Sequence, residues 1–229
     1  MGKDHLARLA APKTWHIDRK STTFITKPVP GSHGLQSGMP INVILKEILK
    51  YASTTKEVKK ILNTNEVKVD GKARKDFRFP VGLFDTLEFP NISEQFRIML
   101  NKGGRLELIK IKKEEASVKP CKIVGKTMVK GKLQLNLYDG RNVLVEKDSF
   151  KTGDSVLLKL PEQEIKDTIK LEKGTTVLLT AGKHIGDTGV VEDIIGRKAK
   201  FKLSNGDVVE TPKDYVFPVG KGESVVKIG

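Results

Sequence analysis

The chain has few of the residues from which extracellular folds and membrane anchors are built. Its 229 residues include a single cysteine, Cys121, so an internal disulfide or a cysteine-built zinc site is excluded. No stretch approaches the roughly 18 apolar residues of a membrane span, and the first residues lack the apolar core of a signal peptide. These absences indicate a reducing compartment, and we expect a cytoplasmic protein with no membrane partner.

The sequence also lacks a recognisable set of catalytic or metal-binding groups. It has no nucleophile with a neighbouring base, no metal-ligand cluster and no phosphate-binding Gly-Lys-Ser/Thr loop before a helix. No two of its four histidines have the helical spacing and nearby carboxylate of a metal site; they are His5, His16, His33 and His184. We therefore predict no catalytic residue, no metal, no cofactor and no small-molecule substrate.

What the chain has in excess is positive charge. Its 42 Lys and Arg residues stand against 28 Asp and Glu residues, which gives a formal net charge of +14. The excess is spread over residues 1–40, 41–106 and 107–170. This distribution favours contact with a polyanion such as nucleic acid along much of the chain. A lysine-rich surface that serves only solubility is the plainer alternative.

Residues 1–40 are expected to form a basic extension. The segment has four prolines and too little apolar periodicity for a core of its own, so we expect it to be disordered until it binds RNA. Trp15 has two open interpretations, stacking on RNA or filling a hydrophobic hollow of its own domain. His5, His16 and His33 could also stack or contact phosphate. The basic residues of the extension that we expect to contact RNA are Lys3, Arg8, Lys13 and Lys20.

Two helices are predicted after Pro40. Apolar residues recur at helical spacing from Ile41 to Ala52, and Pro40 suits the first turn of such a helix. Thr54 with Glu57 three residues later matches a capping box that begins a second, short helix. The apolar face of the second helix leaves three lysines directed to solvent, where phosphates could dock: Lys56, Lys59 and Lys60.

A basic β-hairpin is predicted next. Val67 and Val69 alternate with Lys68, and Asp70-Gly71 is a strong two-residue turn signal. We expect the helix lysines and the hairpin to clamp RNA phosphates and to read shape more than base identity. The hairpin's members of this clamp are Lys68, Lys72, Arg74, Lys75 and Arg78. For any single one of these residues, the alternative is a solvated side chain.

The remainder of the chain is predicted to be β-structure. In residues 107–170, polarity alternates from Leu133 to Val145 around a turn at Asp139-Gly140. In residues 171–229, strands flank a glycine-spaced loop whose tip carries Lys183 and His184, which we expect to contact RNA. The loop glycines suit either tight backbone packing or close approach by a phosphate backbone. The chain is thus predicted to be α+β, mostly β and multi-domain, with domains at 1–40, 41–106, 107–170 and 171–229.

Three segments resemble known RNA-binding families. The run LKYASTTKEVKKILNTNEVKVDGKARKD resembles the αL RNA-binding module, and KGTTVLLTAGKHIGDTGVVEDIIG resembles the KOW motif of small SH3-like barrels. An arm reading HLARLAAPKTWHIDRK precedes them. In this order the segments resemble the archaeal and eukaryotic small-subunit ribosomal protein family S-four-e (S4e) over essentially the whole chain, and the short C-terminus resembles that of archaeal members.

This resemblance implies a structural, non-enzymatic role in the small (30S) ribosomal subunit. The expected partners are 16S rRNA and neighbouring ribosomal proteins, and no homo-oligomer is expected. Two alternatives stay open. Because αL modules also occur in RNA-modifying enzymes, the chain could be an accessory part of such an enzyme. Because KOW segments occur in elongation factors, it could instead be a free factor that binds RNA or polymerase transiently.

Overall fold

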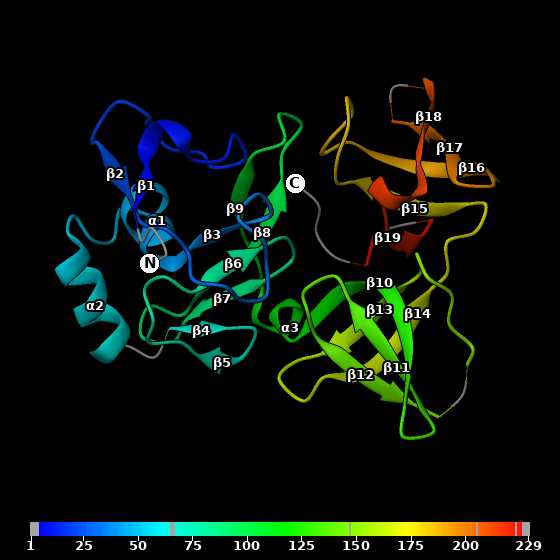
Figure 1. The fold of residues 1–229 in the computed structure, drawn as a ribbon, viewed down its shortest axis with the longest axis horizontal. Helices are drawn as coiled ribbons and strands as arrows, with labels where there is room; N and C mark the ends of the chain where they lie inside the picture. The colour runs from blue at the N-terminus through cyan, green and yellow to red at the C-terminus, as the bar shows by residue number, and fades with distance from the viewer. Residues whose placement is uncertain (1–4, 65–66, 147, 205, 223, 226–229) are drawn as a thin grey trace. The chain divides into compact units, whose positions relative to one another are not determined.

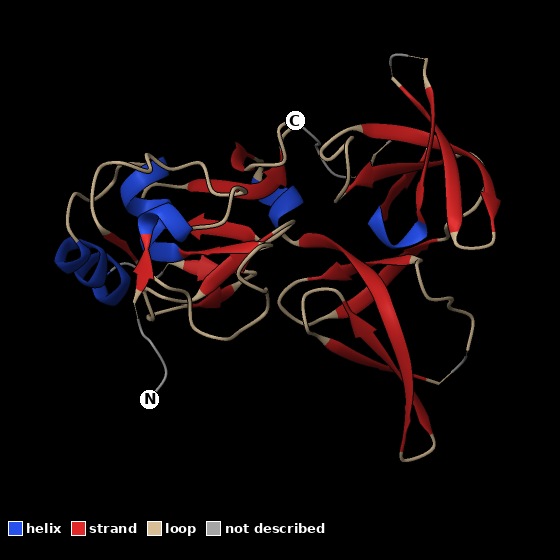
Figure 2. Cartoon of the chain, turned by 45° about the horizontal axis from the view of Figure 1, so that its top comes forward, coloured by secondary structure: helices blue, strands red, loops and turns tan. Residues whose placement is uncertain are grey.

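The chain divides into two compact units (Figure 1). The computed structural model describes residues 5–64, 67–146, 148–204, 206–222 and 224–225. Unit 1 comprises Met1–Met99 and Arg105–Ala116, and unit 2 comprises Leu100–Gly104 and Ser117–Gly229. Strands dominate both units (Figure 2). The expectation of a mostly β chain with several sheets is therefore confirmed.

Unit 1 is built on a five-stranded sheet in the order β5-β4-β7-β8-β9. Asp70 and Gly71 both have positive φ, 52° and 73°, as the mirror-image turn of a two-residue hairpin requires, and the predicted hairpin is confirmed. Unit 1 includes β9 and the following helix α3, so it extends beyond residue 106, where we expected a domain boundary. The bounds are β4 Lys68–Val69, β5 Lys72–Ala73, β7 Thr86–Phe89, β8 Glu94–Leu100, β9 Leu106–Lys110 and α3 Lys113–Ala116.

The first predicted helix is shorter than its apolar pattern indicates. It begins as α1 (Ile41–Val43) and continues as a π-helical turn, η2 (Ile44–Ile48). Lys50 has a left-handed φ of 55°, which is incompatible with a continuing helix. Ala52 is nevertheless buried at 5% exposure. The apolar spacing up to Ala52 therefore reported burial correctly but overestimated the length of the helix.

The second predicted helix is α2 (Thr55–Thr64), and its capping box is confirmed. The Glu57 N–H donates to the Thr54 hydroxyl at 3.2 Å, and the Glu57 carboxylate accepts from the N–H groups of Thr54 at 3.4 Å and Ser53 at 2.8 Å. These bonds satisfy backbone donors that a helix start otherwise leaves free. Val58 and Leu62 are buried, so the opposite side of α2 faces solvent.

The N-terminal arm packs onto the rest of unit 1. Its strand β1 (Leu6–Ala7) leads into the short 3₁₀-helix η1 (Arg8–Ala10) and pairs with β2 (Phe24–Ile25), while β3 (Gly38–Pro40) pairs with β6 (Pro80–Gly82). Trp15 is only 2% exposed. Its indole N–H donates to the carbonyl oxygen of Gly38 at 3.0 Å. Of the two interpretations of Trp15, the structure therefore supports the one in which it fills a hydrophobic hollow.

The described part of the arm thus packs on the rest of unit 1, and its disorder in the absence of RNA stays a prediction. The arm has little apolar periodicity, but it is held by contacts with residues far along the chain. The N–H of Leu106 donates to the carbonyl oxygen of Thr14 at 2.7 Å, and Trp15 forms a bridge to Leu106. Composition alone does not report such long-range anchors.

Unit 2 contains two five-stranded antiparallel sheets, and the first of them is the central module. Its order is β12-β11-β10-β13-β14. Leu133 pairs with Val145 and Leu135 with Val143, as the alternating pattern predicts. A core of its own includes Cys121, Ile123, Leu135, Val156 and Leu158. The bounds are β10 Val118–Val129, β11 Lys132–Leu137, β12 Asn142–Val145, β13 Ser155–Lys159 and β14 Glu164–Ile169.

The second sheet of unit 2, the C-terminal module, has the order β18-β17-β16-β15-β19 and a separate core. A Cβ on Gly186 would lie 2.0 Å from the Asn101 carbonyl oxygen, and one on Gly189 would lie 2.6 Å from that of Lys202. These two glycines therefore serve tight backbone packing within the protein. The bounds are β15 Thr175–Leu179, β16 Thr188–Ile195, β17 Lys198–Leu203, β18 Val208–Pro212, the 3₁₀-helix η3 Lys213–Tyr215 and β19 Val216–Lys221.

Candidate nucleic-acid interface

Exposed basic side chains gather on α2 and on the segment that follows it. Phe77 joins the two elements, because the Lys59 Nζ lies 4.8 Å and the Arg78 guanidinium 5.8 Å from the centroid of its ring. These are cation–π distances. We call the six exposed basic residues of α2 and of the segment 72–78 the α2–hairpin surface: Lys56, Lys59, Lys60, Lys72, Lys75 and Arg78.

Two acidic groups beside this surface, Glu57 and Asp76, are already engaged. Hydrogen bonds from the N–H of Ser53 and from Thr54 hold the pKa of the Glu57 carboxyl below its usual range, so that this carboxylate stays ionised as part of the helix cap. Asp76 accepts from the N–H of Arg78 at 2.8 Å, and its carboxylate lies 3.9 Å from the Arg78 Nε. Both groups of that ion pair are solvent-exposed, so the pair contributes little stability.

Two predicted hairpin residues are set back from solvent. Lys68 and Arg74 are both half-buried. The Arg74 guanidinium lies 4.3 Å from the centroid of the Phe79 ring. Stacking of this kind fixes the planar guanidinium of Arg74 in one orientation. Because both residues are half-buried, we exclude them from the α2–hairpin surface.

The arm residues that we expected to contact RNA differ in their exposure to solvent. Lys13 and Lys20 are exposed, whereas Lys3 lies outside the described residues. Arg8 is buried at 3% exposure. Its guanidinium donates to Glu47 at 2.8 Å, to the Asp18 carbonyl oxygen at 2.8 Å and to the Thr22 hydroxyl at 2.9 Å. Arg8 therefore anchors the arm within the protein instead of presenting its charge to phosphate.

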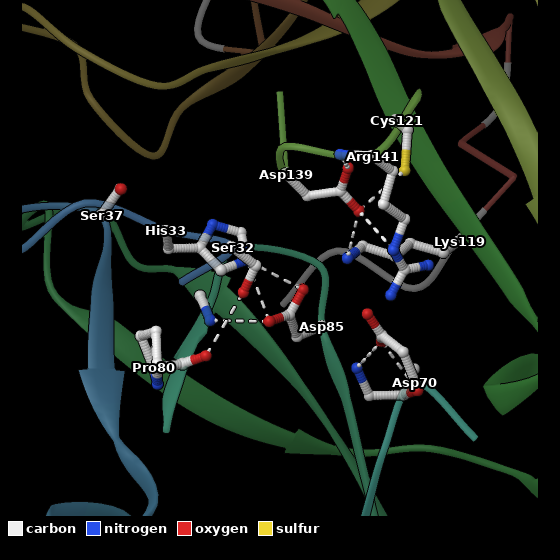
Figure 3. Close-up of polar contacts among 12 residues, drawn as sticks. Ser32, His33, Ser37, Asp70, Pro80, Asp85, Lys119, Cys121, Asp139 and Arg141 are labelled. Atoms are coloured by element: carbon white, nitrogen blue, oxygen red, sulfur yellow. Dashed lines mark hydrogen bonds and ion pairs between the residues drawn. The ribbon is translucent and has the colours of Figure 1, made fainter. Parts of the chain in front are cut away.

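The three histidines of the arm also differ in their exposure to solvent. His5 and His16 are exposed. His33 is buried, and its Nε2 lies 2.9 and 3.0 Å from the two carboxylate oxygens of Asp85 (Figure 3). Asp85 also accepts from the N–H of Gly82 at 2.9 Å. His33 therefore holds a turn of unit 1 and is not accessible to a phosphate.

In unit 2 the loop between β15 and β16 carries the last two predicted residues. Lys183 is exposed and His184 is half-buried. The Nδ1 of His184 lies 3.4 Å from an Asp187 carboxylate oxygen. Lys183 is thus the freer of the two for an external contact.

Among the residues that the structure describes, no three His, Cys, Asp or Glu side chains are grouped closely enough to hold a metal ion. Within the same residues, no helix has the length and apolarity needed to cross a membrane. Cys121 is buried, with its thiol 3.6 Å from Asp139 (Figure 3). Asp139 in turn accepts from the buried Lys119 ammonium at 2.9 Å.

Sequence reasoning missed the aromatic members of this interface. Phe77 and Phe79 alternate with Arg78 in the run DFRFP, and this interleaving of aromatic and basic residues was the available signal. Phe77 is half-buried beside Lys59 and Arg78. Its ring therefore belongs to the surface that the basic residues form.

Similarity to known proteins extends over the whole chain. Residues 1–36 match the RS4NT (NUC023) domain, and residues 92–165 match the family described as Ribosomal family S4e. The chain is 42% identical to the small ribosomal subunit protein eS4 of Methanocella arvoryzae, over 98% of this chain and 97% of that protein. The chain belongs to the ribosomal protein family S4e.

Further S4e relatives agree in sequence and in fold. Identity is 40% to the small ribosomal subunit protein eS4 of Methanocaldococcus jannaschii, over 99% of this chain and 98% of that protein. The crystal structure of the 30S ribosomal protein S4e from Thermoplasma acidophilum superposes with a TM-score of 0.71 at 32% identity, covering 83% of this chain and 99% of that one. The S4e resemblance predicted from the sequence is confirmed.

Proposed function

We propose that this S4e chain is a structural constituent of the small ribosomal subunit, that it binds the rRNA of the subunit and contacts neighbouring ribosomal proteins, and that it catalyses no reaction. One observation carries the proposal, the 42% identity to an archaeal small ribosomal subunit protein over 98% of the chain. Such a protein works in the cytoplasm as part of the ribosome. We further propose that the protein binds 16S rRNA specifically and that it does so as a single copy, not as a homo-oligomer.

Each region has a proposed role in that assembly. Residues 41–106 act as an αL module, since α2 and the β4–β5 hairpin place basic residues side by side. Residues 171–229 act as a KOW-bearing SH3-like barrel, and 107–170 as the central β-domain between them. The arm, residues 1–40, contributes Lys13 and Lys20 as exposed charges.

The α2–hairpin surface is proposed to bind RNA phosphates. Phosphate contacts position a protein on RNA without reading its sequence. If about five phosphates are neutralised, the logarithm of the affinity should fall with the logarithm of salt concentration at a slope of roughly −3.5 to −4.5. A slope near zero would exclude the clamp.

The assembly role is tested by quantitative mass spectrometry across a sucrose gradient of native cell extract, run at low and at moderate salt. We expect stoichiometric recovery with the small subunit at both salt concentrations. Recovery that is substoichiometric or lost with salt would instead favour a modifying enzyme or a free factor.

The clamp is tested by a paired substitution, Lys59→Gln with Lys60→Gln. Removing two phosphate contacts should reduce the magnitude of the salt slope by about 1.4 to 1.8, measured by filter binding to protein-free small-subunit rRNA. The matched control is Lys166→Gln with Lys170→Gln, which removes two exposed lysines of unit 2 and should leave the slope unchanged. An equal loss in both variants would show that net charge, and not this surface, sets the affinity.

A further inference from the structure

Unit 1 contains a polar and aromatic hollow beside the α2–hairpin surface. Its volume is about 330 Å³, and it lies between the arm and the segment formed by α1 and η2. Phe77 lines it, and the same ring is flanked by Lys59 and Arg78. Phe24, Asn42, Lys46 and Glu47 also line it. The hollow is therefore continuous with the proposed phosphate-binding surface.

Two of the lining residues are phenylalanines from distant parts of the chain. Phe24 on β2 is 58% exposed, although an aromatic ring of this size is usually buried. Its ring contacts that of His5, with centroids 5.4 Å apart and planes inclined by 57°. Exposed aromatic rings near basic residues are the surfaces on which proteins stack unpaired RNA bases.

The hollow is also lined by a buried amide with an unused polar atom. Asn42 is 3% exposed, and its Nδ2 donates to the hydroxyls of Thr26 at 2.5 Å and Thr55 at 3.4 Å. Its Oδ1 has no hydrogen-bond partner among the residues that the structure describes. Buried polar atoms are nearly always paired in folded proteins, and the exocyclic amino group of a base is a suitable donor.

The charges around the hollow suit a nucleotide. The Glu47 carboxylate lines it and is paired with Arg8, another lining residue, at 2.8 Å, so a phosphate inside would compete with this carboxylate for Arg8. Lys46 also lines the hollow, and Lys59 and Arg78 lie beside Phe77 at its edge. A nucleotide whose base enters while its phosphates stay outside satisfies both conditions.

We infer that this hollow receives one unpaired base of the small-subunit rRNA, stacked against Phe24 and hydrogen-bonded to Asn42. The inference rests on the proposed function and deepens it, because a surface that holds phosphates would then also read a base. The α2–hairpin surface supplies affinity, and the hollow supplies sequence preference.

The test is the substitution Phe24→Leu in the full chain, with protein-free small-subunit rRNA as the probe. Leucine keeps the apolar bulk but has no π-face, so the affinity at fixed salt should fall about 5- to 150-fold. The salt slope should stay unchanged because no phosphate contact is removed. Phe24→Trp should retain wild-type affinity, and Ile92→Ala, at an exposed apolar side chain of the same unit outside the hollow, should have no effect.

A dimethyl sulfate footprint identifies the base. Wild-type protein should protect one unpaired adenine or cytosine, and Phe24→Leu should restore its reactivity while other protections persist. If Phe24→Leu binds within twofold of wild type with an unchanged footprint, the inference is overturned and the proposed function stands. If wild-type protein itself fails to bind the rRNA, the proposed function is overturned, and the inference with it.

Discussion

The two units attach outlying segments with buried cations that have different partners. In unit 1, Arg8 of the arm donates to the Glu47 carboxylate at 2.8 Å. In unit 2, Lys122 of the central module donates to the carbonyl oxygens of Asp214 at 2.8 Å and Lys213 at 3.4 Å, both in η3 of the C-terminal module. One cation is matched by a carboxylate and the other by neutral dipoles.

Burial without a hydrogen-bonded carboxylate partner among the described residues affects the pKa of Lys122. Burial lowers the pKa of its ammonium group to about 8, and the charge of Lys213 adds to the decrease while Asp214 opposes it. Carbonyl oxygens accept hydrogen bonds but carry no full charge to offset the lost hydration of an ammonium group. A cation that fastens two segments through carbonyl oxygens alone therefore makes the attachment sensitive to pH.

The arm and the C-terminal module also differ in how much they depend on such a buried cation. The C-terminal module has its own apolar core, which includes Val177, Phe201 and Val216. The arm has no such core and depends on Trp15, Arg8 and a few backbone bonds. Substitutions in the arm's anchors should therefore release the arm, whereas loss of Lys122 should leave the C-terminal module folded.

The largest expected effect is that of Trp15→Ala. Truncation of a fully buried tryptophan leaves a cavity and should lower the free energy of unfolding by about 3–5 kcal/mol, measured by urea denaturation followed by circular dichroism. Amide signals of residues 5–36 should lose dispersion. Trp15→Phe, which removes the bond to Gly38 but keeps an aromatic ring, is the control with a smaller loss. A loss under about 1 kcal/mol for Trp15→Ala would show that Trp15 does not anchor the arm.

The next largest effect is expected for Arg8→Met. It removes a charged guanidinium that makes three hydrogen bonds and should cost about 2–3 kcal/mol. The fluorescence of Trp15, the single tryptophan, should shift to the red at lower urea concentration. Arg19→Met is the matched control, because Arg19 donates to backbone oxygens of the same arm and not to a carboxylate. Equal losses in the two variants would contradict the role given to Glu47.

The smallest effect is the pH dependence from Lys122. Between the folded pKa of about 8 and the ordinary value of 10.5, the unfolded chain binds more protons than the folded chain, so the free energy of unfolding rises with pH. From pH 7 to pH 9.5 the gain should be about 2 kcal/mol relative to Lys122→Met, in which this group is absent. Urea denaturation at both pH values measures it. Parallel pH profiles for wild type and variant would show that Lys122 ionises as it does in water.

Local features of this protein were predictable because short-range rules govern them. The capping box at Thr54 and Glu57 involves atoms a few residues apart, and the Asp70-Gly71 turn needs only a backbone that accepts positive φ. The strands of the central module between Leu133 and Val145 followed from alternation of polarity, and those of the C-terminal module from the glycine-spaced loop and turn signals between them. The end of the first helix was missed because apolar spacing reports burial and does not report where the backbone leaves the helix.

The sequence by itself determined the S4e family, the basic character of the chain and the strands and turns that local rules specify. Only the tertiary structure decided which charges stay available to RNA. Arg8 meets a carboxylate 39 residues away and His33 one that is 52 residues away, and the hollow joins Phe24, Asn42 and Phe77. The reason is physical. A charged or aromatic side chain faces solvent or a partner according to which distant segments pack around it, and neither composition nor periodicity encodes that packing.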